Sequence, residues 1–160
     1  TPGLEHRIGG LEKSDGSGSV SYDPANHELM SRARAAKVQH VAATYTPCEV
    51  FGDHEGDLLV VSWGGTLGAV REAVLQARGA GSHHIGHLHL RHLNPLPGDL
   101  GAILTRYRRV LAPELNSGQL AQLLRAKYLI DVQTYSKLQG QPFYVHELVQ
   151  AINAQLEIGS

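Results

Sequence analysis

The sequence has little that would tie it to nucleic acid, a membrane or a disulfide framework. Fourteen Lys and Arg stand against fifteen Asp and Glu, so the net charge of −1 indicates no basic surface for nucleic acid or anionic lipid. No apolar run approaches the ~18 residues of a membrane span, and no secretory signal pattern is present. Cys48 is the one cysteine. A single thiol excludes an internal disulfide and an all-cysteine iron–sulfur cluster, and it favours a reducing, cytoplasmic setting.

The start of the chain is poor in apolar residues. TPGLEHRIGG carries no Met and no targeting pattern, and we expect it to come from within a longer chain. Residues 1–22 are rich in Gly and Ser and are predicted to form a linker or an interface arm laid over a partner. Asp23 as N-cap and Pro24 at the first helical position then predict a helix to about Ala43. The domain itself is therefore expected to cover residues 23–160.

Strands and helices alternate through the rest of the chain. Strands are predicted at residues 48–51, 57–63, 84–93, 109–115 and 132–138, with helices after the glycine-rich turn at 64–68, near 98–107, at 117–129 and at 145–156. DLLVVSW (57–63) is continuously apolar, as a strand buried on both faces should be. The pattern predicts an α/β domain with a mostly parallel sheet covered by helices on both faces.

The turn WGGTLG follows the central predicted strand and resembles a phosphate-binding loop. A dinucleotide fingerprint requires three glycines, and ending it at Gly68 places Gly65 third but Trp63 first, so the first glycine is missing. No Lys follows the glycines as a P-loop requires. The favoured prediction is a tight turn with Thr66 as helix N-cap. A weak anion site at Gly64, Gly65, Thr66 and Gly68 remains as the alternative.

Five histidines, His83, His84, His87, His89 and His92, fall within ten residues. On a strand, His87 and His89 share one face, and two such side chains can share a metal. Arg91 lies on that face as well, and no acid in the run supplies a third ligand. We therefore favour polar residues on an interface-facing strand over a metal site.

Two further segments carry candidate interface residues. In PELNSGQL, Asn116 and Gln119 have the spacing of a helix capping box, whereas Glu114 at the end of a strand stands where α/β proteins place ligands or partners. In QPFY, Phe143 and Tyr144 are either exposed aromatics that dock on a neighbour or packing residues at a helix start. No segment supplies a complete catalytic set.

Five segments in unbroken order resemble one protein family: GLEKSDGSGSVSYDPANHELM, SWGGTLGAVREA, HLHLRHLNPLP, PELNSGQLAQLLRAKY and LQGQPF. They are similar to the C-terminal region of the alpha subunit of 2-oxoglutarate:ferredoxin oxidoreductase, within the 2-oxoacid:acceptor oxidoreductase family. The positions that recur in the motifs are Trp63, Gly64, Thr66, Gly68, Arg91, Asn94, Pro95, Glu114, Asn116, Gly118 and Gln119.

The resemblance implies a transketolase C-terminal-like domain, a three-layer α/β/α sandwich whose five-stranded sheet has one antiparallel edge strand. It implies an enzyme that decarboxylates a 2-oxoacid oxidatively with CoA, giving an acyl-CoA and CO2. Thiamine diphosphate, Mg and an iron–sulfur cluster would belong to the complete enzyme and no cofactor to this segment. The implied partners are the beta subunit, the N-terminal domains of the parent chain and ferredoxin. No catalytic residue carries over, and Arg91, Asn94, Glu114, Asn116, Gln119 and Phe143 are interface candidates.

The sequence leaves two other functions open. A nucleotide- or anion-binding regulatory domain would use the turn from Gly64 to Gly68, and a metal module would use the histidines. Neither the identity of the 2-oxoacid nor the oligomeric state follows from the residues.

Overall fold

The computed structural model describes residues 2–3 and 9–158. The contacts divide the chain into two compact units, with the division between Tyr45 and Thr46. The sequence predicted a domain boundary after residue 22, whereas the contacts group the helix that follows, up to Tyr45, with the first unit. Part of the predicted arm, residues 1 and 4–8, lies outside the described residues.

The first unit is a small hairpin followed by a helix. Lys13 and Val20 form an antiparallel bridge, and helix α1 covers Pro24–His40, followed by the 3-10 turn η1 at Val41–Thr44. The predicted cap is confirmed, since the Asp23 carboxylate accepts the Ala25 N–H at 3.2 Å. No residue among those described in this unit is buried, so it has no apolar core of its own.

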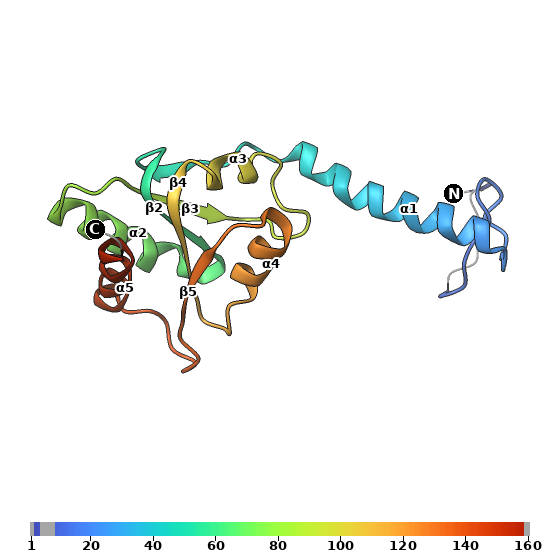
Figure 1. Ribbon diagram of the computed structural model, residues 1–160. Helices are drawn as coiled ribbons and strands as arrows, with labels where there is room; N and C mark the ends of the chain where they lie inside the picture. Colours follow the sequence, from blue (N-terminus) through green and yellow to red (C-terminus); the bar gives the residue numbers. More distant parts are fainter. Residues whose placement is uncertain (1, 4–8, 159–160) are drawn as a thin grey trace. The chain divides into compact units, whose positions relative to one another are not determined.

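The second unit holds the sheet, formed from five described strands (Figure 1). These are β1 Val50–Gly52, β2 Gly56–Trp63, β3 Ile85–Leu90, β4 Tyr107–Glu114 and β5 Val132–Ser136. Their order is β1-β3-β2-β4-β5, and β1 pairs antiparallel with β3 while the other pairs are parallel. The predicted mostly parallel sheet with one antiparallel edge strand is confirmed.

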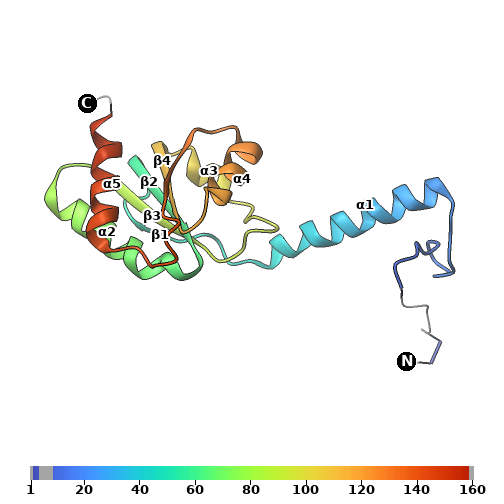
Figure 2. The same cartoon turned by 90° about the horizontal axis from the view of Figure 1, so that it is seen from below.

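Helices cover both faces of this sheet, as the turned view also shows (Figure 2). Helices α2 (Leu67–Ala80, after the 3-10 turn η2 at Gly64–Thr66) and α5 (Val145–Glu157) pack on one face. Helices α3 (Leu100–Leu104) and α4 (Gln119–Tyr128) pack on the other. Because side chains of a strand alternate between faces, β2 sends Leu58 and Val60 to the first layer and Leu59 and Val61 to the second. The three-layer α/β/α sandwich is therefore confirmed.

Candidate functional site

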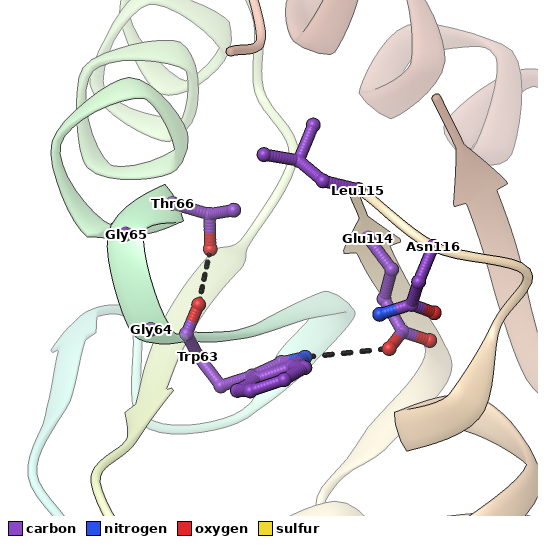
Figure 3. A pocket seen from close by; sticks show the side chains of 7 residues that line it. All are labelled: Trp63, Gly64, Gly65, Thr66, Glu114, Leu115 and Asn116. Carbon is purple, nitrogen blue, oxygen red and sulfur yellow. Dashed lines mark hydrogen bonds between the residues drawn. The ribbon is translucent and has the colours of Figure 1, made fainter. Parts of the chain in front are cut away.

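The candidate site is a pocket at the carboxyl ends of β2 and β4. These strands are parallel neighbours, yet the helix after β2 packs on one face of the sheet and the helix after β4 on the other. Such a divergence opens a crevice beyond the strand ends, which is where α/β proteins bind their ligands. The pocket encloses about 230 Å³ and is lined by Trp63, Gly64, Gly65, Thr66, Glu114, Leu115 and Asn116 (Figure 3).

Glu114 joins the two sides of this pocket. Its Oε1 accepts the Trp63 indole N–H at 3.3 Å and the Leu120 N–H at 2.8 Å, and its Oε2 accepts the Ala121 N–H at 3.1 Å. The side chain is only 1% exposed. The carboxylate thus satisfies amides in the first turn of α4, where the helix dipole also favours a negative charge.

The burial of Glu114 changes its expected role. The sequence predicts a contact to a ligand or partner, but the carboxylate is buried and already accepts hydrogen bonds from the indole and two amides. Glu114 is a positioning residue that fixes the end of β4 to the start of α4 and holds the Trp63 ring across the pocket. An acid at a strand end shortly before a helix is also typical of a residue that bonds the amides of that helix.

The glycine-rich turn has a conformational explanation. Gly64 has φ of +60°, a left-handed conformation that other residues rarely adopt. Thr66 stands at the N-cap position of α2 as predicted, but its hydroxyl donates to the Trp63 carbonyl at 2.8 Å and caps no amide. The hydroxyl therefore tightens the turn where a capping bond was expected.

The sequence predicted Asn116 as the N-cap of the helix, but α4 begins at Gln119 and its N-cap is Gly118, so Asn116 lies in the turn before the helix. Its Oδ1 accepts the N–H groups of Gly118 and Gln119, each at 2.9 Å. Gly118 has φ of +90°, which explains the glycine directly before the helix. Gln119 is the first residue of α4 and not the third, so the predicted capping box does not form.

The pocket is a poor match for a nucleotide. Its one charged side chain is a carboxylate, which repels phosphate, and about 230 Å³ lies below the roughly 300–1,000 Å³ of small-molecule sites. The indole of Trp63 and the side chain of Leu115 instead give it an apolar character. The geometry suits one bulky apolar group better than a phosphorylated ligand.

The histidine run forms no metal centre in residues 2–3 and 9–158, where no group of three or more potential ligands is close enough to hold an ion. His87 and His89 do share a face, and the Ser62 hydroxyl bonds His87 Nε2 at 2.7 Å and His89 Nδ1 at 2.8 Å. Burial, followed by the charges of His89 and Arg71, lowers the pKa of His87 to about 4. His87 is 1% exposed, so the expected interface role does not fit its position.

The remaining interface candidates differ in exposure. Arg91, Asn94 and Gln119 are exposed, and the peptide bond from Asn94 to Pro95 is cis. Phe143 is only 6% exposed and packs against Tyr135 with ring centroids 5.6 Å apart. Of the two roles considered for the pair, Phe143 therefore takes the packing role at the helix start, while its neighbour Tyr144 is 55% exposed.

The structure brings two predicted motifs together and leaves others apart. The turn at Gly64–Thr66 and the segment with Glu114 and Asn116 line one pocket. Gly68, Arg91, Asn94, Gln119 and Phe143 are not among its lining residues. Leu115 is the last residue of the predicted strand 109–115, and nothing in the sequence distinguishes it from the other apolar residues of that strand.

The fold is that of a transketolase C-terminal-like α/β domain. A solved split-gene transketolase, 19% identical, matches it with a TM-score of 0.52 over 72% of this chain and 44% of that one. The chain belongs to the alpha-subunit family of the 2-oxoacid:ferredoxin oxidoreductases. It is 50% identical over 158 residues to 2-oxoglutarate oxidoreductase subunit KorA of Mycobacterium tuberculosis, a match that covers 98% of this chain and 24% of that subunit.

Two further relatives agree with this family. The alpha subunit of 2-oxoacid:ferredoxin oxidoreductase 1 of Aeropyrum pernix is 31% identical over 150 residues, covering 88% of this chain and 23% of that subunit. The solved 2-oxoglutarate:ferredoxin oxidoreductase of Magnetococcus marinus, with 2-oxoglutarate, coenzyme A and succinyl-CoA bound, is 34% identical with a TM-score of 0.89. It covers 98% of this chain and 28% of that one. The chain thus spans about a quarter of these relatives. No protein-family model matches it.

Proposed function

We propose that this chain is the C-terminal assembly domain of the alpha subunit of a 2-oxoglutarate:ferredoxin oxidoreductase. The observation that carries the proposal is its 50% identity to the Mycobacterium tuberculosis subunit over 98% of this chain. The second support is the site itself, where Glu114 and Trp63 serve to position structure and no residue that lines the pocket pairs a nucleophile with a base. The domain supports the assembly of the enzyme and does not catalyse the reaction alone.

The proposed reaction of the complete enzyme is the oxidative decarboxylation of 2-oxoglutarate with CoA to succinyl-CoA and CO2, with electrons passing to ferredoxin. The family implies thiamine diphosphate, Mg and an iron–sulfur cluster for this chemistry. A single cysteine cannot hold a four-cysteine cluster, and no group of three or more potential metal ligands lies together among the described residues. We therefore assign the cofactors to other parts of the enzyme.

The proposed partners are the beta subunit, the remaining part of the alpha polypeptide and, through the complex, ferredoxin. We expect the arm before α1 and the carboxyl edge of the sheet to take part in assembly. A cytoplasmic location belongs to the proposal, because a lone cysteine suits a reducing compartment. No described helix has both the length and the apolar character needed to cross a membrane.

Reconstitution tests the proposal. The 160-residue chain, carrying an affinity tag, is mixed with the other parts of the oxidoreductase, and the complex is isolated and assayed for CoA-dependent 2-oxoglutarate decarboxylation. We expect co-purification and activity only when this chain is present. A chain that neither binds the other parts nor restores activity to a complex lacking it would refute the proposal. Omitting the chain from an otherwise identical mixture is the control.

A further inference from the structure

Large apolar side chains are exposed along one edge of the sheet unit. Leu67 follows β2, Leu115 follows β4, and Leu138 and Tyr144 follow β5, and all four are among the exposed large hydrophobic residues. Because the carboxyl ends of parallel strands meet at one edge of a sheet, these side chains lie at the same edge as the pocket. An apolar cluster of this kind, next to a hollow, is typical of a docking surface.

The pocket within this edge has room for one bulky side chain. The Trp63 indole forms one wall and Leu115 stands on the opposite side, while Gly64 and Gly65 leave the backbone of the turn uncovered (Figure 3). A Cβ placed on either glycine would have no heavy atom within 4 Å, which confirms the open space above the turn. A leucine or phenylalanine side chain fits such a volume, in the manner of an interface anchor residue.

Arg91 directly follows β3, the neighbour of the strand whose end carries Trp63. Trp63 and Leu90 are the last paired residues of the parallel strands β2 and β3, so Arg91 is the first residue beyond this pairing. Arg91 is exposed, and it makes no ion pair with the residues that the structure describes. A carboxylate on the occupant would complement this charge.

We propose that the carboxyl edge docks a segment of the remaining alpha polypeptide that inserts one bulky apolar side chain between Trp63 and Leu115. A neighbouring carboxylate of that segment pairs with Arg91. The inference rests on the proposed function, since it takes the occupant from the same subunit. The relatives are about four times as long as this chain, so most of such a polypeptide lies outside the described structure. A tethered segment has a high effective concentration, which allows a small pocket to hold it.

Site-specific photo-crosslinking in the complete enzyme tests this inference. Leu115 is replaced by benzoylphenylalanine, the assembled enzyme is irradiated, and the crosslinked peptides are identified by mass spectrometry. We expect crosslinks to one peptide of the alpha polypeptide outside these 160 residues, containing a bulky apolar residue next to Asp or Glu. The matched control places the same probe at Leu75, an exposed leucine of α2 that lies further along the helix, and should not give that peptide.

The charge contact is tested in the same experiment. The Arg91→Glu variant should lower the yield of the Leu115 crosslink by up to about fivefold, the range expected for an exposed ion pair. Crosslinks from Leu115 to the beta subunit, to ferredoxin or to a second copy of this chain would overturn the assignment of the occupant. An assembled, active enzyme that gives no crosslink from Leu115 would overturn the docking site while leaving the proposed function intact.

Discussion

Glu114 shows how one side chain can connect two elements at a site. Its carboxylate accepts three N–H groups, one from the end of β2 and two from the first turn of α4. Charged acceptors form stronger hydrogen bonds than neutral ones, and a buried amide without a partner is costly. The residue therefore contributes stability and also determines the position of the Trp63 ring.

We expect Glu114→Gln to lower the free energy of unfolding by about 1–3 kcal/mol. The substitution keeps the size of the side chain but offers one carbonyl oxygen where two carboxylate oxygens served. Urea denaturation followed by Trp63 fluorescence measures the change, and the assignment is simple because Trp63 is the single tryptophan. Glu72→Gln is the matched control, since Glu72 is exposed and bonds only the Gln76 side chain in the described structure. Equal losses in the two variants would contradict the role of Glu114.

His87 is the second residue with a predictable energetic effect. It is buried, its Nε2 bonds Ser62, and its Nδ1 has no hydrogen-bond partner among the described residues. The neighbouring His89, Arg71 and Arg91 all disfavour a further positive charge in this cluster. The folded protein therefore holds His87 neutral, with its pKa lowered to about 4.

Stability should consequently fall as the pH is lowered through the range from about 6.5 to 4. Above pH 6.5 the histidine is neutral in both states, whereas between these values the unfolded chain binds a proton that the folded state excludes. The expected loss is about 2 kcal/mol between pH 7 and pH 5. His89, whose pKa is also lowered by burial, acts in the same direction.

Urea denaturation at pH 7, 6 and 5 measures this dependence. The His87→Phe variant should show a flatter dependence, because the titrating ring is gone. Exposed His40 on α1, replaced by Asn, serves as the control and should leave the slope unchanged. A variant at position 87 that keeps the full slope would show that another group carries it.

At the scale of elements, the sequence predicted the sheet better than the site. The apolar run 57–63 and the alternating run 84–93 became β2 and β3, since burial on both faces of a parallel strand leaves a direct mark on composition. The short helix expected at 98–107 is only Leu100–Leu104, because β4 already begins at Tyr107. Element ends depend on tertiary hydrogen bonds that no local pattern records.

The site was less predictable because its residues come from distant parts of the chain. Trp63 and Glu114 are 51 positions apart and meet only because β2 and β4 are neighbours in the sheet. Their order in the sheet cannot be read from periodicity. The sequence identified the two motifs. Only the adjacency of β2 and β4 in the sheet shows that the Glu114 carboxylate bonds the Trp63 indole and the amides of α4.

Helix α1 is an element whose stability must come from local terms. It is 17 residues long and has no buried residue, so it rests on the Asp23 cap and on side-chain pairs such as Glu28 with Arg32. Isolated helices of this length are marginal in water. In the 160-residue chain we expect the free energy of local opening that allows amide hydrogen exchange in α1 to be about 0–1 kcal/mol, the lower end of the range for native proteins.

Hydrogen exchange measured by mass spectrometry checks this expectation. Peptides from α1 should exchange fully before peptides from β2, which serve as the internal control. Asp23→Ala should accelerate exchange in α1 further, because an N-cap contributes about 1 kcal/mol. Protection in α1 equal to that in β2 would mean that tertiary contacts stabilise the helix in the chain alone.

At the scale of the whole molecule, the two units contribute unequally to stability. All buried residues among those described belong to the second unit, where the apolar ones form two clusters on opposite faces of the sheet. The first unit is joined internally by polar contacts, in which Glu12 accepts from Arg34 and bonds His27. Exposed ion pairs of this kind stabilise weakly, so the first unit is better suited to contact with a partner than to folding by itself.

Deleting residues 1–45 should therefore leave the free energy of unfolding of the sheet unit unchanged within about 0.5 kcal/mol. Residues 46–160 retain the five described strands, both helical layers and the Trp63–Glu114 contact, so urea denaturation should remain a single transition. If the first unit serves assembly, the same truncation should abolish co-purification with the other parts of the oxidoreductase. A large loss of stability would show that the first unit completes the core. Unchanged stability with unchanged assembly would place the interface within residues 46–160 alone.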